Sequence, residues 1–176
     1  MPSPDLNRIA AEAQLARQQS AAPTSPKADD SLVETTAPDI NGLRWAQFGL
    51  TTSGLLLHRR PFRRTWTDWQ PMGQPSGTRF KKIATEAQNF DGYMGYRYID
   101  LFAVDSTGRL WHRWWWGIPD RPHNGCWYGW EDWGEGFEPL LTVTNRGPAR
   151  IEVAARRGGR WFHRQYINGW NGWSIR

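Results

Sequence analysis

The sequence predicts an all-β fold built from about three repeated units, and three observations predict it. Short apolar segments alternate with glycine-containing turns, and no helical periodicity follows the N-terminal part of the chain. One pattern, two apolar strands around such a turn with His-Arg at the end, occurs three times, at residues 45–59, 99–113 and 151–164. The chain of 176 residues also holds 13 tryptophans, all of them between Trp45 and Trp173.

The spacing of the repeats indicates propeller-like blades. His58, His112 and His163 close the three copies and are 54 and 51 residues apart. A period near fifty residues with about four short strands per unit is typical of a β-propeller blade, and large aromatic side chains fill the wedge between neighbouring blades. We therefore expect about three blades of a partial or oligomer-completed propeller. Their repeats lie near residues 44–73, 80–136 and 140–176.

Residues 1–40 differ from the β-body at 41–176 and are expected to form an N-terminal arm. The arm has no Phe, Tyr or Trp and carries three basic and six acidic side chains, whereas the body carries 19 basic and 11 acidic ones. Ser3 as an N-cap predicts a helix over residues 1–20. The Pro, Ser and Thr content of residues 21–39 predicts an extended linker. The helix is either a frayed tail or a docking element that tethers the body to a partner.

Composition narrows the class of protein. The basic body could attract an anionic surface, but its Lys and Arg are spread along the predicted strands and no known nucleic-acid module is present, so nucleic acid is the least favoured partner. A single cysteine, Cys126, excludes an intrachain disulfide framework. No apolar run is long enough to span a bilayer, and Asp5 and Glu12 interrupt any secretory signal. We expect a protein of the cytoplasm or of a released particle.

The second copy carries a resemblance to a known family. Residues 100–114 include Leu-Phe-Ala and then Asp-x-x-Gly-x-Leu-Trp-His-Arg-Trp, and Trp130-Glu-Asp-Trp133 follows. This pattern resembles the bacterial seven-bladed β-propeller lectins of the PLL type, relatives of the tectonin-like and fucose-binding propellers, over roughly residues 44–176. The resemblance implies a non-enzymatic, lectin-like module without a cofactor, which holds fucose-like sugars in shallow pockets between blades.

The number of repeats departs from that family. Three blades leave open sheet faces and cannot close a ring, whereas the lectins have seven. We therefore expect the chain to complete a ring by self-association, to dock on another protein, or to form a small open β-body.

A Trp-x-x-Trp motif follows each copy and supplies the candidate ligand-binding residues. Indoles stack on the C–H faces of sugars, but they pack between sheets at least as often. The repeated histidines likewise fit either a site or an internal hydrogen bond. The candidates are Trp66, Trp69, Trp130, Trp133, Trp170, Trp173, His58, His112 and His163.

The run Trp114-Trp115-Trp116 predicts an indole outside the core. Consecutive strand residues point to opposite faces of a sheet, so at least one of the three should be available to a partner. Instead of a partner, the insertion at residues 117–125 could cover this indole.

Metal binding and catalysis are not expected. His112, His123 and Cys126 do not have a recognised ligand spacing. The acids at Glu131, Asp132 and Glu135 are read as solvated loop residues, and no nucleophile elbow, phosphate loop or dinucleotide fingerprint is present.

Two functions remain. The first is a lectin-like, carbohydrate-binding module carried in a larger assembly, with glycans as partners. The alternative is a structural or accessory subunit of a multiprotein complex or phage-like particle, tethered by its N-terminal arm.

Overall fold

The computed structural model describes residues 31–40, 43–44, 46–62, 65–89, 97–117, 125–167 and 169–175. Every regular element within these ranges is a β-strand, so the predicted all-β class is confirmed for this part of the chain. The predicted helix at residues 1–20 lies outside the described residues, as does the predicted linker up to residue 30.

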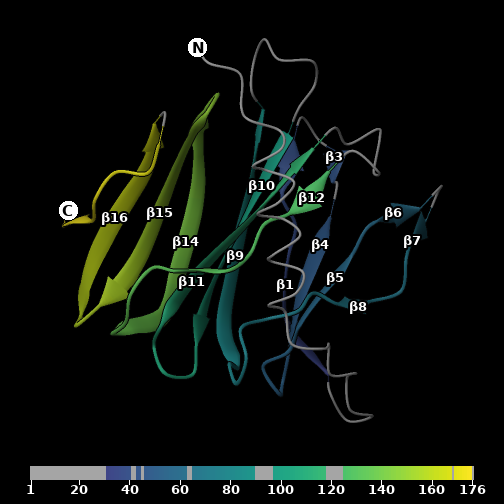
Figure 1. Ribbon diagram of the computed structural model, residues 1–176, viewed down its shortest axis with the longest axis horizontal. Coiled ribbons are helices and arrows are strands. Elements are labelled where there is room, and N and C mark those ends of the chain that lie inside the picture. The colour runs from purple at the N-terminus through teal and green to yellow at the C-terminus, as the bar shows by residue number, and fades with distance from the viewer. Residues whose placement is uncertain are drawn as a thin grey trace.

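Three antiparallel sheets form the body (Figure 1). The first sheet has the order β1 (Leu32–Thr36), β4 (Gln47–Thr51), β5 (Leu56–Arg59), β8 (Gln70–Pro71). The second has β9 (Phe80–Asn89), β10 (Arg97–Asp105) and β11 (Leu110–Gly117), with β12 (Cys126–Trp127) and β13 (Glu131–Asp132) both paired to β11. The third has β14 (Phe137–Gly147), β15 (Arg150–Arg157), β16 (Arg160–Ile167) and β17 (Ser174–Ile175). Two short ribbons pair β2 (Asp39–Ile40) with β3 (Leu43–Arg44) and β6 (Pro61–Phe62) with β7 (Thr65–Trp66).

The three sheets are stacked with the second sheet in the middle (Figure 1). One core lies between the first and second sheets, and another lies between the second and third. The innermost strand of the second sheet, β9, contacts β1 on one side and β14 on the other. The second sheet is therefore buried on both faces.

Burial on both faces explains the apolar sequence of β10. Leu101 and Ala103 point into the core against the first sheet, whereas Phe102 and Val104 point into the core against the third. All four are fully buried. A strand covered on both faces reads as a continuous apolar run rather than an alternating one.

The strand β1 corrects the predicted linker. Leu32–Thr36 falls within residues 21–39, but in the structure it pairs with β4 along the inner edge of the first sheet. The Glu34 carboxylate forms an ion pair with Lys82 and accepts a hydrogen bond from Ile83 N (3.3 Å), which ties β1 to the second sheet. The linker prediction is wrong for these five residues, because β-branched side chains and a long-range ion pair outweigh their polar composition.

Backbone hydrogen bonds align the three repeats. The segment after each hairpin returns to the same position of the preceding strand in all three sheets. The bonds are Thr67 N to Arg60 O (2.9 Å), Tyr128 N to Trp114 O (2.8 Å) and Asn171 N to Gln165 O (3.0 Å). The outermost strands have the same register, with His58 opposite Gln70, His112 opposite Glu131 and His163 opposite Ser174.

This alignment corrects the predicted motif of the second copy. Trp66/Trp69 and Trp170/Trp173 are structurally equivalent to Trp127/Trp130, not to Trp130/Trp133. Trp133 takes the position of Met72 in the first sheet. The prediction was three residues out of register because Trp127, Trp130 and Trp133 are evenly spaced, so the sequence contains two overlapping motifs.

One hydrogen bond joins the second sheet to the turn of the first, and an equivalent bond joins the third sheet to the turn of the second. Phe80 N donates to Gly54 O (3.0 Å), and Phe137 N donates to Gly108 O (2.8 Å). Both glycines have a positive φ, of 82° and 81°, which disfavours other residues. The same step therefore leads from the first sheet to the second and from the second to the third.

We predict that Gly108→Ala destabilises the body more than Gly77→Ala. Both glycines have a positive φ, 81° and 74°, so an alanine is strained by about 1 kcal/mol at either position. At Gly108 the new Cβ would also lie 2.9 Å from Phe137 O, whereas at Gly77 it meets nothing within 4 Å. We expect roughly 1–2 kcal/mol of additional loss at Gly108, measured by urea unfolding. Equal losses in the two variants would contradict a tight joint between the sheets.

Candidate functional site

The His-Arg pairs place one side chain on each face of every sheet. Phe48 and His58 are register partners, and Phe48 packs against the second sheet, so Arg59 lies on the other face. We call the histidine side of a sheet its leading face and the arginine side its trailing face. At the first junction the leading face of the first sheet meets the trailing face of the second, where Arg113 Nη1 donates to Met72 O (2.9 Å). The second junction joins the second and third sheets in the same way.

Each arginine of these pairs lies over an indole ring. The distances from Cζ to the ring centroid are 4.5 Å for Arg59 over Trp69, 5.5 Å for Arg113 over Trp127 and 4.1 Å for Arg164 over Trp133. Nε of Arg113 also donates to Tyr128 O (2.7 Å), and Nε of Arg164 donates to the equivalent Asn171 O (2.8 Å). Burial lowers the pKa of Arg113 to about 10, so it stays charged at neutral pH and is stabilised by the ring faces and the carbonyl.

A hydrogen-bonded chain of two carboxylates and one imidazole crosses the second sheet. Asp100 Oδ1 lies 2.9 Å from His112 Nε2, and Glu131 Oε2 lies 3.3 Å from His112 Nδ1. Gln88 Nε2 donates to the second oxygen of Asp100 (3.0 Å). Burial alone would lower the pKa of His112, but the hydrogen bonds and charges of the two carboxylates raise it above its ordinary value. His112 is therefore buried and hydrogen-bonded to two carboxylates, and its side chain is not exposed to a ligand.

The equivalent histidine of the first sheet has the opposite protonation behaviour. The positions of Asp100 and Glu131 are taken by Ala46 and Gln70 in this sheet. Burial, followed by the charges of Arg113 and Arg60, lowers the pKa of His58 to about 4. His58 is therefore neutral at physiological pH.

The third histidine belongs to a cluster around a buried glutamate. His163 Nδ1 lies 3.3 Å from Glu152 Oε1, Arg146 donates to the same oxygen (3.0 Å) and Gln165 donates to Oε2 (2.6 Å). The hydrogen bond from Gln165, together with those from Arg146 and His163, lowers the pKa of Glu152 to about 2, although burial opposes the shift. A shallow pocket next to this cluster is lined by Arg146, Arg150, Ile151, Glu152, Gln165, Tyr166 and Ile167.

The six predicted tryptophans lie in three places rather than in one site. Trp130 is on the first core, Trp133, Trp170 and Trp173 are on the second core, and Trp66 and Trp69 are beside Arg59. All six are half-buried. Packing between the sheets therefore accounts for the burial of Trp130, Trp133, Trp170 and Trp173. Trp66 and Trp69 pack against Arg59 on the outer face of the first sheet instead.

The tryptophan run in β11 alternates as predicted. Trp115 packs on the first core, and Trp114 is on the other face, stacked between His112 (centroids 5.4 Å apart) and Tyr128 (4.6 Å). His112 stacks in turn on Phe102 (4.6 Å). The rings of Phe102, His112, Trp114 and Tyr128 thus form one continuous stack on the leading face of the second sheet.

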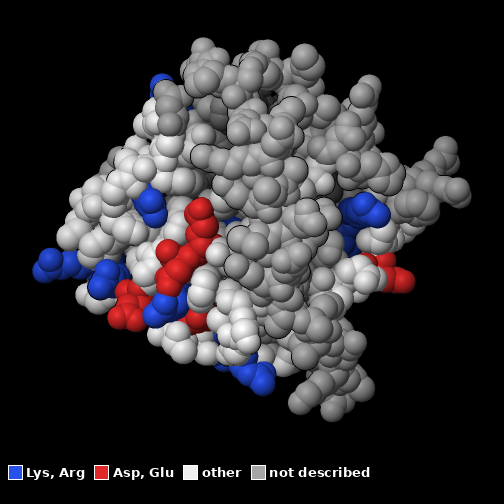
Figure 2. Space-filling model, in the orientation of Figure 1, with Lys and Arg blue, Asp and Glu red and all other residues white. Residues whose placement is uncertain are grey.

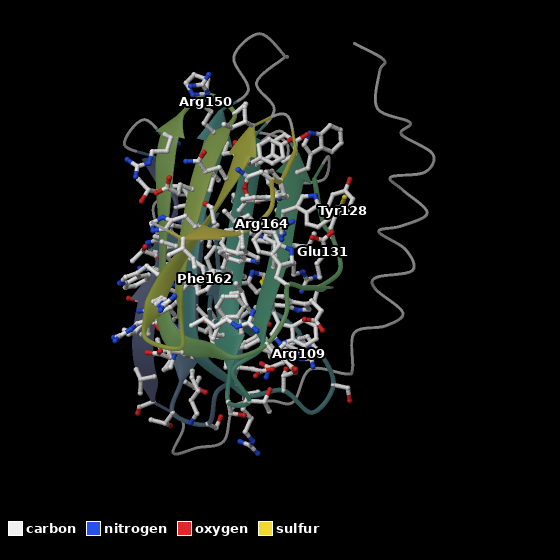
Figure 3. All side chains as sticks on the ribbon, turned by 90° about the vertical axis from the view of Figure 1, so that its left-hand side faces the viewer. Arg109, Tyr128, Glu131, Arg150, Phe162 and Arg164 are labelled. Atoms are coloured by element: carbon white, nitrogen blue, oxygen red, sulfur yellow. The ribbon has the colours of Figure 1, made fainter. Side chains whose placement is uncertain are left out.

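Glu131, Trp133 and Arg164 form a polar group at the outer part of the second junction, which we call the junction site. The Glu131 side chain is 47% exposed, and its Oε2 also accepts a hydrogen bond from Trp133 Nε1 (3.2 Å). Arg164, from the third sheet, lies over the ring of the same indole. In Figure 3 Glu131 and Arg164 lie at mid-height of the sheets, with Tyr128 nearby, Arg109 at one end and Arg150 at the other.

The electrostatics of the junction site favour a charged carboxylate. Burial would raise the pKa of Glu131, but the hydrogen bond and charge of His112, the hydrogen bond from Trp133 and the charge of Arg164 lower it below its ordinary value. Sequence reasoning read Glu131 as a solvated loop acid and did not single out Arg164. The feature that identifies Glu131 is its position opposite His112 in the neighbouring strand. This register is visible only in the structure.

The neighbouring acids do lie at the surface, in ion pairs. Arg109 pairs with Asp132 and with Glu135 (3.2 Å). On the side of the molecule drawn in Figure 2, acidic and basic side chains lie next to one another over one part of the surface. These two acids contact a surface arginine and not the junction site.

Comparisons with protein-family models and with curated proteins find no match to this chain. Among the described residues, no group of three or more His, Cys, Asp and Glu side chains is arranged to hold a metal ion, and His123 lies outside them. The described residues also contain no helix that is both long and apolar enough to cross a membrane.

We predict opposite pH dependences for His58→Gln and His112→Gln. The pKa of His58 is depressed to about 4, so the folded state loses stability as the pH falls from about 6.5 towards 4. Between pH 7 and pH 5 this amounts to about 2 kcal/mol, which His58→Gln should abolish. The pKa of His112 is raised, so its contribution is complete below about pH 6.5 and is lost as the pH rises through the folded value.

Urea unfolding of both variants and the unsubstituted chain at pH 5, 7 and 8 measures these differences. His112→Gln should cost more at pH 5 than at pH 8, while His58→Gln should become relatively more favourable at pH 5. Parallel curves for the two variants would contradict the assigned environments.

Proposed function

We propose that the three sheets are blades of a β-propeller of the lectin type, and that the chain is a non-enzymatic glycan-binding module. The blade assignment is supported by the four-position antiparallel order of each sheet, by the contact of the innermost strands and by the repeated hydrogen bond that joins one sheet to the next. The three-fold recurrence of the Arg-indole contact supports the same repeat.

The junction site is the observation that carries the binding proposal. Both described contacts of the Glu131 carboxylate go to Oε2, which leaves Oε1 for a ligand hydroxyl. Arg164 uses Nε for Asn171 O, which leaves its Nη groups as donors. A charged acceptor and a fork of donors beside the edge of the Trp133 indole match neighbouring sugar hydroxyls. A fucose-like sugar fits this chemistry.

Binding is favoured over hydrolysis by the charge state of Glu131. A glycosidase needs one carboxylic acid with a raised pKa to protonate the leaving group. The pKa of Glu131 is lowered instead, by His112, Trp133 and Arg164. A carboxylate held in this state accepts hydrogen bonds but does not serve as a general acid at neutral pH.

We predict that Glu131→Gln weakens glycan binding about 10- to 100-fold, the effect of weakening a hydrogen bond to a charged group. A glycan array identifies the sugar that the unsubstituted chain binds, and calorimetry with that sugar then compares the variants. Glu135→Gln is the matched control, because Glu135 is exposed and pairs only with Arg109 among the described residues.

Two results would overturn the glycan proposal. One is an array with no signal above background for the folded, unsubstituted chain. The other is an equal affinity of Glu131→Gln and Glu135→Gln, since the junction site would then take no part in binding. Thermal unfolding of each variant establishes that the comparison is made on folded protein.

A further inference from the structure

The stack of three sheets has two outer faces of opposite kind. The first sheet presents its trailing face outward, and the third sheet presents its leading face outward, at the two ends of the stack (Figure 1). Both junctions within the chain are formed by one leading and one trailing face. The outer faces are thus the two halves of a further junction, and within the described residues nothing covers either of them.

Leu32 lies on the outward, trailing face of the first sheet. Leu32, Phe80 and Phe137 are equivalent, because each begins the innermost strand of its sheet opposite Thr51, Asp105 or Arg157. Phe80 and Phe137 bond to the preceding turn and are 1% and 5% exposed, whereas Leu32 is 39% exposed. Leu32 therefore begins a sheet that no other sheet of the described residues precedes.

Large apolar side chains are also exposed on the leading face of the third sheet. Trp161 is opposite Arg156 and Ile167 is opposite Arg150, in line with His163 opposite Ala154. Trp161 is 38% exposed and takes the position of the fully buried Leu110 in the second sheet. Leu140 precedes the core residue Leu141 and so points to this same face.

We propose that a second copy of this chain docks head to tail, with the trailing face of its first sheet on the leading face of the third sheet. Leu32 of one copy then packs against the turn between β15 and β16 of the other, and Leu32 N donates to Gly159 O as Phe137 N donates to Gly108 O. Arg59 comes to face the His163–Glu152 cluster, as Arg164 faces His112 and Glu131 at the second junction.

Two copies close the assembly. Six sheets lie within the range of four to eight blades that propellers use, whereas three copies would give nine. The two new interfaces would be identical and would leave no outer face. Both docking faces carry small polar side chains, with Thr35 and Gln47 on one and Thr142 and Gln165 on the other, so the dimer is more polar than the internal junctions and should dissociate on dilution.

This inference rests on the blade assignment in the proposed function but not on sugar binding. Native mass spectrometry and sedimentation over a range of concentrations test it with the full chain. The expected species has twice the 20.4 kDa chain mass. Leu32→Asp and Trp161→Asp should each raise the dissociation constant of the dimer at least about tenfold. Ile175→Asp is the control, because Ile175 is 55% exposed on the outermost strand and points away from the two proposed docking faces.

Mixing the two weakened variants tests the head-to-tail arrangement. A mixed dimer of Leu32→Asp and Trp161→Asp contains one unaltered interface, so the mixture should dimerise more strongly than either variant alone. No such gain is expected if like faces pair.

A folded monomer at all concentrations would overturn the proposal, and so would a larger species, or a dimer that Leu32→Asp, Trp161→Asp and Ile175→Asp affect equally. Sole association with a different protein would also overturn it. A dimer without a glycan-array signal contradicts only the sugar proposal, and a glycan-binding monomer contradicts only the dimer.

Discussion

The alternation of side chains along one strand end is the constraint on which the body depends. A histidine followed directly by an arginine must point them to opposite faces, so one dipeptide contributes to two junctions. The arginine lies over indoles of the junction behind it, and the histidine occupies the junction ahead. Repeating this unit every fifty residues or so leaves the second sheet covered on both sides and gives the stack a direction. The two ends of the stack then differ, and each is the complement of the other.

Divergence within the repeat decides what each junction can do. The histidine is retained in all three sheets, but its carboxylate partners differ. His112 has both Asp100 and Glu131, His163 has Glu152, and His58 has neither. The shared hairpin therefore carries different chemistry at each junction. The imidazole of His58 is neutral at the buried first junction, whereas at the second junction the pKa of His112 is raised and its ring lies against the carboxylate of Glu131.

The sequence was sufficient for the class of fold and for the three hairpins, because glycine turns between apolar strands are local signals. It was insufficient for β1, whose polar Leu-Val-Glu-Thr-Thr segment is a strand only through pairing with β4 and the Glu34–Lys82 ion pair. It also left the tryptophan motif ambiguous, because evenly spaced indoles fit two registers. The hydrogen bond of Tyr128 N and the pairing of the outermost strands distinguish them. Glu131 and Arg164 come from different sheets, so their proximity depends on the stacking of two repeats and could not be found within either one.

The alignment of the three repeats also limits the number of junction sites. The residue equivalent to Glu131 is Gln70 at the first junction and Ser174 at the interface that a second copy would form, so neither position has a carboxylate. Met72 replaces the indole of Trp133 at the first junction, and Arg113 is buried there with its donors directed to carbonyl groups. The carboxylate, the guanidinium and the exposed indole edge coincide only at the second junction. Sugar binding at this site therefore implies one site per chain and two in a closed dimer, at equivalent positions on opposite sides of the ring.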